Sequence, residues 1–148
     1  MFHHSRKICT TLLFTFFLLI GTNGCKDDYN SVVPYVYVNM NINPTNFIEF
    51  NIPGGSYYFP NNGYGGIIIF RDLTESANPF LAFDATCTHE ISTTTRVVAN
   101  ESGIATCPVC KSQFILFGGN GSPIKGPAIE PLRQYKTNYT GGRIIVSN

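Results

Sequence analysis

The chain has 148 residues, a net charge of +1 and only 13% charged residues. This length allows one domain with a single core, and a near-neutral chain without a basic stripe gives nucleic-acid binding no electrostatic support. Glycine, asparagine, proline, aromatic and β-branched residues are abundant, which is typical of short strands joined by tight turns.

The N-terminal segment is typical of an export signal. Arg6 and Lys7 supply positive charge, and a mostly apolar run follows from Ile8 to Ile20. This run has about 13 residues, whereas a helix that spans a membrane needs roughly 20. The segment therefore favours a signal peptide over a helical membrane anchor.

Gly24-Cys25, at the end of this segment, resembles the lipobox of bacterial lipoproteins, in which the cysteine is acylated and becomes the mature N-terminus. The resemblance implies a signal peptide over residues 1–24, lipidation of Cys25 and a lipid anchor in the outer membrane. Lys26-Asp27-Asp28 resembles the tag that sends some Gram-negative lipoproteins to the cell surface, although an ordinary linker would look the same. The periplasmic side and the cell surface therefore both remain open.

Residues 25–45 are expected to form a linker and an edge strand that precede the domain at 46–148. Val32–Val38 alternates in part, and Pro34 restricts such a strand to the edge of a sheet. Another short strand is expected at Phe47–Phe50.

The strongest apolar run, Ile67–Phe70, predicts a buried strand, and Phe80–Asp84 predicts its hairpin partner across a loop of about eight residues. Turn signals separate the strands that follow, which are expected at 96–99, 104–106, 114–117, 132–136 and 143–146. No stretch after the signal shows a helical apolar period over three turns. The chain is therefore predicted to be all-β.

One histidine and three cysteines follow Cys25, and they lie in two short loops as Cys87-x-His89 and Cys107-x-x-Cys110. Thiolates and imidazoles are the ligands that soft or borderline metals favour. Loops at the tips of adjacent hairpins can bring these four groups to one point. A structural disulfide, Cys107–Cys110 or Cys87–Cys107, is the alternative in an exported domain.

These two loops resemble the cluster-binding loops of Rieske proteins, Cys-x-His and Cys-x-x-His-Gly-Ser-x-Phe or Tyr. The resemblance extends from about Gly66 to the C-terminus and includes Gly126-Pro127-Ala128, which is similar to the proline loop that shields the cluster. It implies an antiparallel β-sandwich with a small metal-binding subdomain of two hairpin loops. It also implies a [2Fe–2S] cluster and electron transfer.

Carried over by position, the resemblance places Cys87 and Cys107 on the inner iron and His89 on the outer iron. Cys110 stands at the second histidine position, so a cluster here would have three cysteines and one histidine. The added thiolate charge favours the oxidised form and lowers the reduction potential. Lys111 stands where glycine is usual, and it would offset part of this effect if it lay near the cluster. Ser112 is at the position that donates a hydrogen bond to a cluster sulfur.

The sequence thus predicts an electron-transfer protein with an unknown redox partner rather than an enzyme with its own substrate. No carboxylate pair, Ser–His pair or phosphate loop stands out, and a solvated turn is the favoured environment for Asp84. A structural zinc site is the second hypothesis, because three cysteines and one histidine form an ordinary set of ligands for tetrahedral zinc. The third is a metal-free surface lipoprotein that acts as an interaction module.

Overall fold

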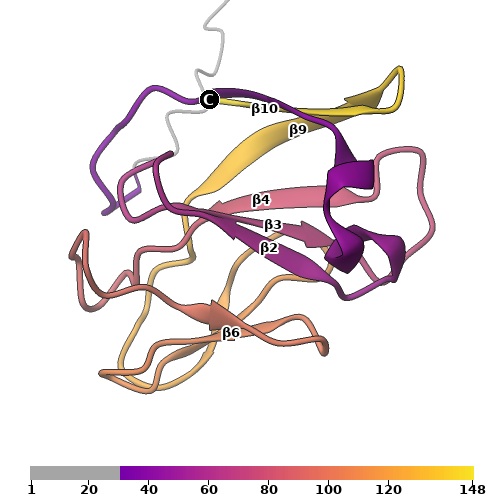
Figure 1. Ribbon diagram of the computed structural model, residues 1–148. Coiled ribbons are helices and arrows are strands. Elements are labelled where there is room, and N and C mark those ends of the chain that lie inside the picture. Colours follow the sequence, from indigo (N-terminus) through magenta and orange to yellow (C-terminus); the bar gives the residue numbers. More distant parts are fainter. Residues whose placement is uncertain (1–30) are drawn as a thin grey trace, which may run out of the picture.

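The computed structural model describes residues 31–148, which form an almost entirely β structure (Figure 1). The expected signal peptide, the lipidation site Cys25 and the tag at 26–28 lie outside the described residues. Within residues 31–148, no helix is long and apolar enough to cross a membrane.

Ten strands and two short 3₁₀ helices make up the described part of the chain. The strands are β1 (Asn39–Ile42), β2 (Ser56–Phe59), β3 (Ile67–Arg71), β4 (Phe80–Asp84), β5 (Val98–Ala99), β6 (Ile104–Thr106), β7 (Gln113–Ile115), β8 (Pro123–Lys125), β9 (Gln134–Thr140) and β10 (Arg143–Ser147). The 3₁₀ helices are η1 (Pro44–Asn46) and η2 (Ile48–Asn51).

The strands form two antiparallel sheets. The larger sheet has the order β1-β10-β9-β4-β3-β2, and the smaller one has the order β5-β6-β7-β8. In Figure 1 the smaller sheet, around β6, lies as a separate layer below β2, β3 and β4. The predicted all-β class and the predicted hairpin of β3 and β4, with its loop at 72–79, are confirmed.

The hairpin of β3 and β4 is buried on both faces, which explains its continuous apolar sequence. Because successive strand residues point to opposite faces, Ile67 and Ile69 of β3 enter one core with β1, β10 and η2. Ile68 and Phe70 enter a second core with the small sheet and the two cysteine loops. The hairpin is thus the wall that both cores share.

Two expected strands differ in the structure. One edge strand of the large sheet is β1, which begins directly after the predicted stretch Val32–Val38 and pairs with β10. The predicted strand at Phe47–Phe50 is instead Phe47, the residue between η1 and η2, followed by the first three residues of η2. A separation of three residues in a 3₁₀ turn places Phe47 and Phe50 on one side, and their ring centroids lie 5.5 Å apart. Strands β2 and β8 were not predicted.

Asp84, the last residue of β4, is fully buried rather than solvated. Its carboxylate accepts hydrogen bonds from the backbone N–H groups of Tyr64, Gly65 and Thr86 at 2.7, 3.1 and 3.0 Å. The hydroxyls of Thr86 and Tyr135 donate two more, at 2.6 and 2.9 Å. Five donors compensate the buried carboxylate. Through Asp84, these hydrogen bonds connect β9 and the turn before β3 to Thr86, the residue before Cys87.

The pKa of the Tyr135 hydroxyl is raised, first by burial and then by the adjacent Asp84 carboxylate. Tyr135 therefore stays protonated in the folded chain at a pH where the unfolded chain, with a pKa near 10.0, begins to ionise. The stability that this difference contributes is complete below pH 10 and is lost as the pH rises above it.

Tyr135→Phe should lower the free energy of unfolding at neutral pH by about 1–3 kcal/mol, because it removes a hydrogen bond to a charged group. It should also weaken the loss of stability above about pH 10. Urea unfolding at pH 7 and at alkaline pH measures both effects. Tyr139→Phe, on the same strand but partly exposed, is the matched control. Equal behaviour of the two variants would contradict this role of Tyr135.

Candidate metal centre

The first cysteine loop leaves β4 at Asp84 and is held in an extended course before it reaches Cys87. Ala85 donates its N–H to the Gly66 carbonyl at 2.8 Å and accepts the N–H of Val97 at 2.7 Å. Thr86 forms an isolated antiparallel bridge with Arg96. The loop from 87 to 95 therefore projects from a base that is fixed on both sides.

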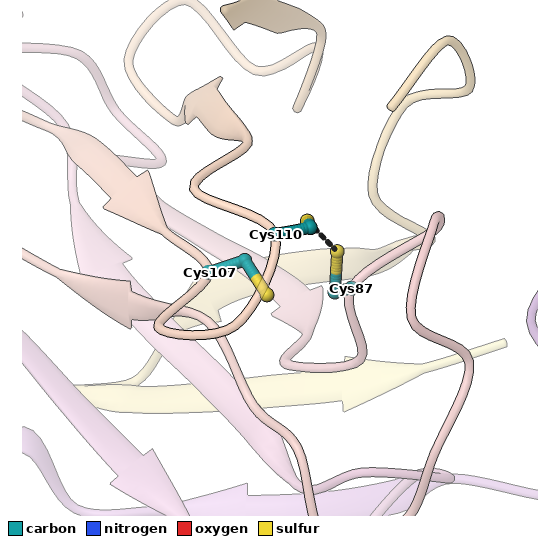
Figure 2. A group of neighbouring side chains, drawn as sticks. All are labelled: Cys87, Cys107 and Cys110. Carbon is teal, nitrogen blue, oxygen red and sulfur yellow. Dashed lines mark hydrogen bonds between the residues drawn. The ribbon is translucent and has the colours of Figure 1, made fainter. Parts of the chain in front are cut away.

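The second cysteine loop is the turn that joins β6 to β7. The N–H of Cys107 donates to the Ser112 carbonyl at 2.8 Å, and the N–H of Lys111 donates to the Cys107 carbonyl at 3.1 Å. These two bonds close a tight turn over Pro108 and Val109. Figure 2 shows that this turn carries Cys107 and Cys110 on the side that faces Cys87 of the first loop.

The three thiols converge as predicted. Their sulfur atoms all lie within 4.8 Å of one another, and Cys87 and Cys110 share an S–H···S hydrogen bond of 3.5 Å (Figure 2). Cys87 and Cys107 are fully buried, whereas Cys110 is partly exposed. All three thiols are free. Neither disulfide considered from the sequence, Cys107–Cys110 or Cys87–Cys107, is present.

The environments of Cys87 and Cys110 differ in their effect on ionisation. Burial raises the pKa of the Cys87 thiol to about 12, although the backbone N–H groups of Glu90 and His89 donate to its sulfur. Burial also acts to raise the pKa of Cys110, but the Ser112 hydroxyl and backbone N–H can donate to its ionised, thiolate form and lower the pKa below its ordinary value. Metal binding at this site must therefore displace the Cys87 proton.

His89 does not belong to the group of thiols that lies within 4.8 Å. Its side chain is 45% exposed, and its Nε2 atom lies 3.9 Å from the Glu90 carboxylate. The Cys-x-His spacing places His89 only two residues from Cys87, on the projecting part of the loop. The structure therefore forms a tripod of Cys87, Cys107 and Cys110, with the imidazole outside it.

Lys111 has a φ of 63°, the only left-handed backbone among the non-glycine residues at 31–148. Glycine adopts this conformation without strain, whereas other residues rarely do. The loop thus keeps a glycine-like conformation although it has lysine at this position. The ammonium group of Lys111 donates to the Pro108 carbonyl, so it is tied to its own turn.

The proline loop packs against both cysteine loops. The fully buried Ser112 hydroxyl accepts the N–H of Ala128 at 3.0 Å, and the Cys110 thiol donates to the same oxygen at 3.1 Å. A Cβ on Gly126 would lie 2.5 Å from Ser112 Cα, so only glycine allows this approach. Pro127 itself is exposed. Ala128, by contrast, is buried in the same core as Cys87 and Cys107.

Thr88 is a site residue that the sequence did not single out. Its hydroxyl donates to the Glu130 carbonyl at 2.7 Å and thereby links the first cysteine loop to the proline loop. In the sequence, Thr88 is marked only by its position between Cys87 and His89, and that position does not predict a hydrogen bond to Glu130.

The chemistry of these donors fits a soft or borderline metal. Two sulfurs on one tetrahedral ion, with metal–sulfur bonds of about 2.3 Å, lie about 3.8 Å apart, close to the separation of Cys87 and Cys110. Backbone N–H groups directed at Cys87, and the Ser112 hydroxyl beside Cys110, can stabilise thiolates by hydrogen bonding. Cys87, Cys107 and Cys110 therefore fit an iron–sulfur or zinc centre.

Comparison with known proteins gives no sequence match: no family model and no curated protein matches the chain. Its fold, however, is shared with solved structures. It superposes on the Rieske protein PetC3 of the plasma membrane of Synechocystis PCC 6803 with a TM-score of 0.53 and 23% identity, over 77% of this chain and 100% of that one.

Two further structures belong to carbazole 1,9a-dioxygenase. The ferredoxin from Nocardioides aromaticivorans IC177 has a TM-score of 0.51 and 21% identity, over 76% of this chain and 98% of that one. A chain from the complex of reduced oxygenase and oxidized ferredoxin has a TM-score of 0.52 and 18% identity, over 74% of this chain and 93% of that one. The described part of this chain therefore has a Rieske-like fold.

Proposed function

We propose that this protein is an electron-transfer protein that holds a [2Fe–2S] cluster through Cys87, Cys107, Cys110 and His89. The observation that carries the proposal is the convergence of three thiols from two loops of a Rieske-like domain. Such a cluster would supply a one-electron redox step. His89 would be the fourth ligand, because it is the only histidine in residues 31–148 and lies two residues from Cys87. Its imidazole lies outside the tripod in this structure, so the proposal requires the side chain to turn toward the sulfurs.

The surrounding residues suit this role in three ways. Cys87 and Cys107 keep their sulfurs out of water. Ser112 places a hydroxyl beside the Cys110 sulfur. Thr88 fastens the proline loop across the site. Hydrogen bonds to sulfur and exclusion of water are among the factors that set the potential of an iron–sulfur centre.

A zinc site in the same scaffold is the second candidate. The observation that favours it is that all three sulfurs lie within 4.8 Å, as thiolates on one ion do. Thiolates on the two different irons of a cluster are further separated, because the iron–iron distance is added between them. Zinc would need only the tripod and a fourth ligand, either His89 or water.

We further propose that the protein is exported and anchored in the outer membrane by lipid on Cys25, with a redox protein as its partner. The apolar run at 8–20 and the Gly24-Cys25 pair support the anchor. Electron transfer without a substrate site of its own requires a partner protein that donates or accepts the electron.

The full chain prepared without oxygen should be brown and contain iron and acid-labile sulfide in equal amounts. His89→Ala should lose or alter the visible spectrum, whereas Thr93→Ala, at an exposed position of the same loop, should leave it unchanged. Metal analysis, sulfide analysis and absorption spectroscopy measure these outcomes. Colourless protein with one equivalent of zinc would contradict the cluster and support the second candidate.

Cys110→His should raise the reduction potential of the cluster by on the order of 100 mV or more, because it replaces a thiolate by a neutral imidazole. Spectroelectrochemical titration of both proteins measures the shift. An unchanged or lower potential in a variant that still holds iron and sulfide would show that Cys110 is not a ligand.

Cys25→Ala should abolish labelling of the protein by radioactive palmitate and release it from the membrane fraction. Cys9→Ala, within the apolar run, is the matched control and should keep the label. Labelled protein after Cys25→Ala would contradict the assignment of the lipidation site.

A further inference from the structure

The separation of Cys87 and Cys110 suits a shared metal ion, and it also brings two thiols close to the distance of a disulfide bond. The two sulfurs come from different loops, lie 3.5 Å apart and share a direct hydrogen bond. A disulfide bond is about 2.05 Å long, so small rotations of the two side chains, closing about 1.5 Å, would bring the sulfurs to bonding distance. This pair differs from both pairs that the sequence suggested.

We propose that Cys87 and Cys110 form a reversible disulfide in the metal-free protein, and that this bond blocks metal binding. The disulfide itself follows from the geometry of the thiols. Its effect on metal binding rests on the proposed function, because the bond would consume two of the candidate ligands.

The solvent exposure of the thiols determines which of them reacts first. Cys110 is the only partly exposed thiol of the tripod, and Cys87 and Cys107 are fully buried. A dissolved disulfide therefore reaches Cys110 first. Within the protein, the hydrogen bond places Cys87 beside the sulfur that has been modified.

The oxidant is a low-molecular-weight disulfide such as oxidised glutathione. Cys110 attacks one of its sulfurs, the glutathione S–S bond breaks, and a Cys110–glutathione mixed disulfide forms as the first glutathione leaves with the Cys110 proton. Cys87 then attacks the Cys110 sulfur, and the second glutathione leaves with the Cys87 proton. Two thiols have lost two electrons, and one glutathione disulfide has become two glutathiones.

The disulfide would form within loops that are already held in place. Thr88 and Ser112 tie both cysteine loops to the proline loop, so a link between the loops needs no large movement of either. Cys107 would remain as a buried free thiol. Reduction by excess thiol would restore the tripod, which makes metal loading depend on the redox state of the surroundings.

Peptide mapping tests the disulfide without reference to metal. The metal-free full chain is incubated with oxidised glutathione, its remaining thiols are blocked with N-ethylmaleimide, and it is digested with trypsin. Cys87 lies in the tryptic peptide 72–96, and Cys107 and Cys110 lie in 97–111, apart from Cys9 and Cys25 in 8–26. We expect peptide 72–96 to be joined to peptide 97–111 by a Cys87–Cys110 disulfide, with N-ethylmaleimide on Cys107. We expect Cys110→Ala to abolish this joined pair of peptides.

A Cys107–Cys110 bond, a Cys87–Cys107 bond or glutathione retained on Cys110 as the final product would overturn the proposal.

A second measurement tests whether the disulfide blocks metal binding. Oxidised protein should take up neither zinc nor iron with sulfide, and it should regain uptake after treatment with dithiothreitol. Uptake by the linked protein would overturn the block while leaving the disulfide in place. Failure of the reduced protein to bind either metal would instead refute the proposed function.

Discussion

The site depends on the buried carboxylate of Asp84. A charge at this depth is tolerated only when hydrogen bonds replace its hydration, and Asp84 has five donors, from the turn at 64–65, from Thr86 and from Tyr135. One of these donors, Thr86, is followed directly by Cys87. The position of the first cysteine loop, and with it the candidate ligand Cys87, is therefore set by an interaction that also joins β4 to β9.

The second constraint is the packing of three loops against one another. The turn at 107–112 presents two thiols, the loop at 87–95 presents one, and the proline loop fastens to both through Ser112 and Thr88. Because Cys87, Cys107 and Ala128 are part of the core between the sheets, the sulfurs sit at the boundary of a hydrophobic interior. Burial of this kind keeps Cys87 protonated without metal and makes its ionisation part of metal binding.

Much of this arrangement could be predicted from the sequence, and the failures have physical reasons. Ile67–Phe70 was recognised as a buried strand because a strand with two buried faces must be apolar throughout. Val32–Val38 has strand-like composition, yet the pairing with β10 begins only at Asn39, the residue after this stretch. Phe47 and Phe50 belong to a 3₁₀ segment whose side chains pack as aromatic neighbours. The burial of Asp84 could not be inferred, since its donors are distributed between residues 64 and 135. The cysteine and histidine spacing predicted that four groups would converge; the structure brings the three thiols together and leaves the His89 imidazole outside the group.

The proposed iron–sulfur centre, shared by sulfurs from two loops, is tested by X-ray absorption at the iron K-edge of the anaerobically prepared full chain. We expect a sulfur shell around iron, an iron–iron scattering contribution from a binuclear core and a single imidazole contribution. Iron surrounded only by oxygen and nitrogen, or the absence of bound iron together with a zinc edge, would contradict it.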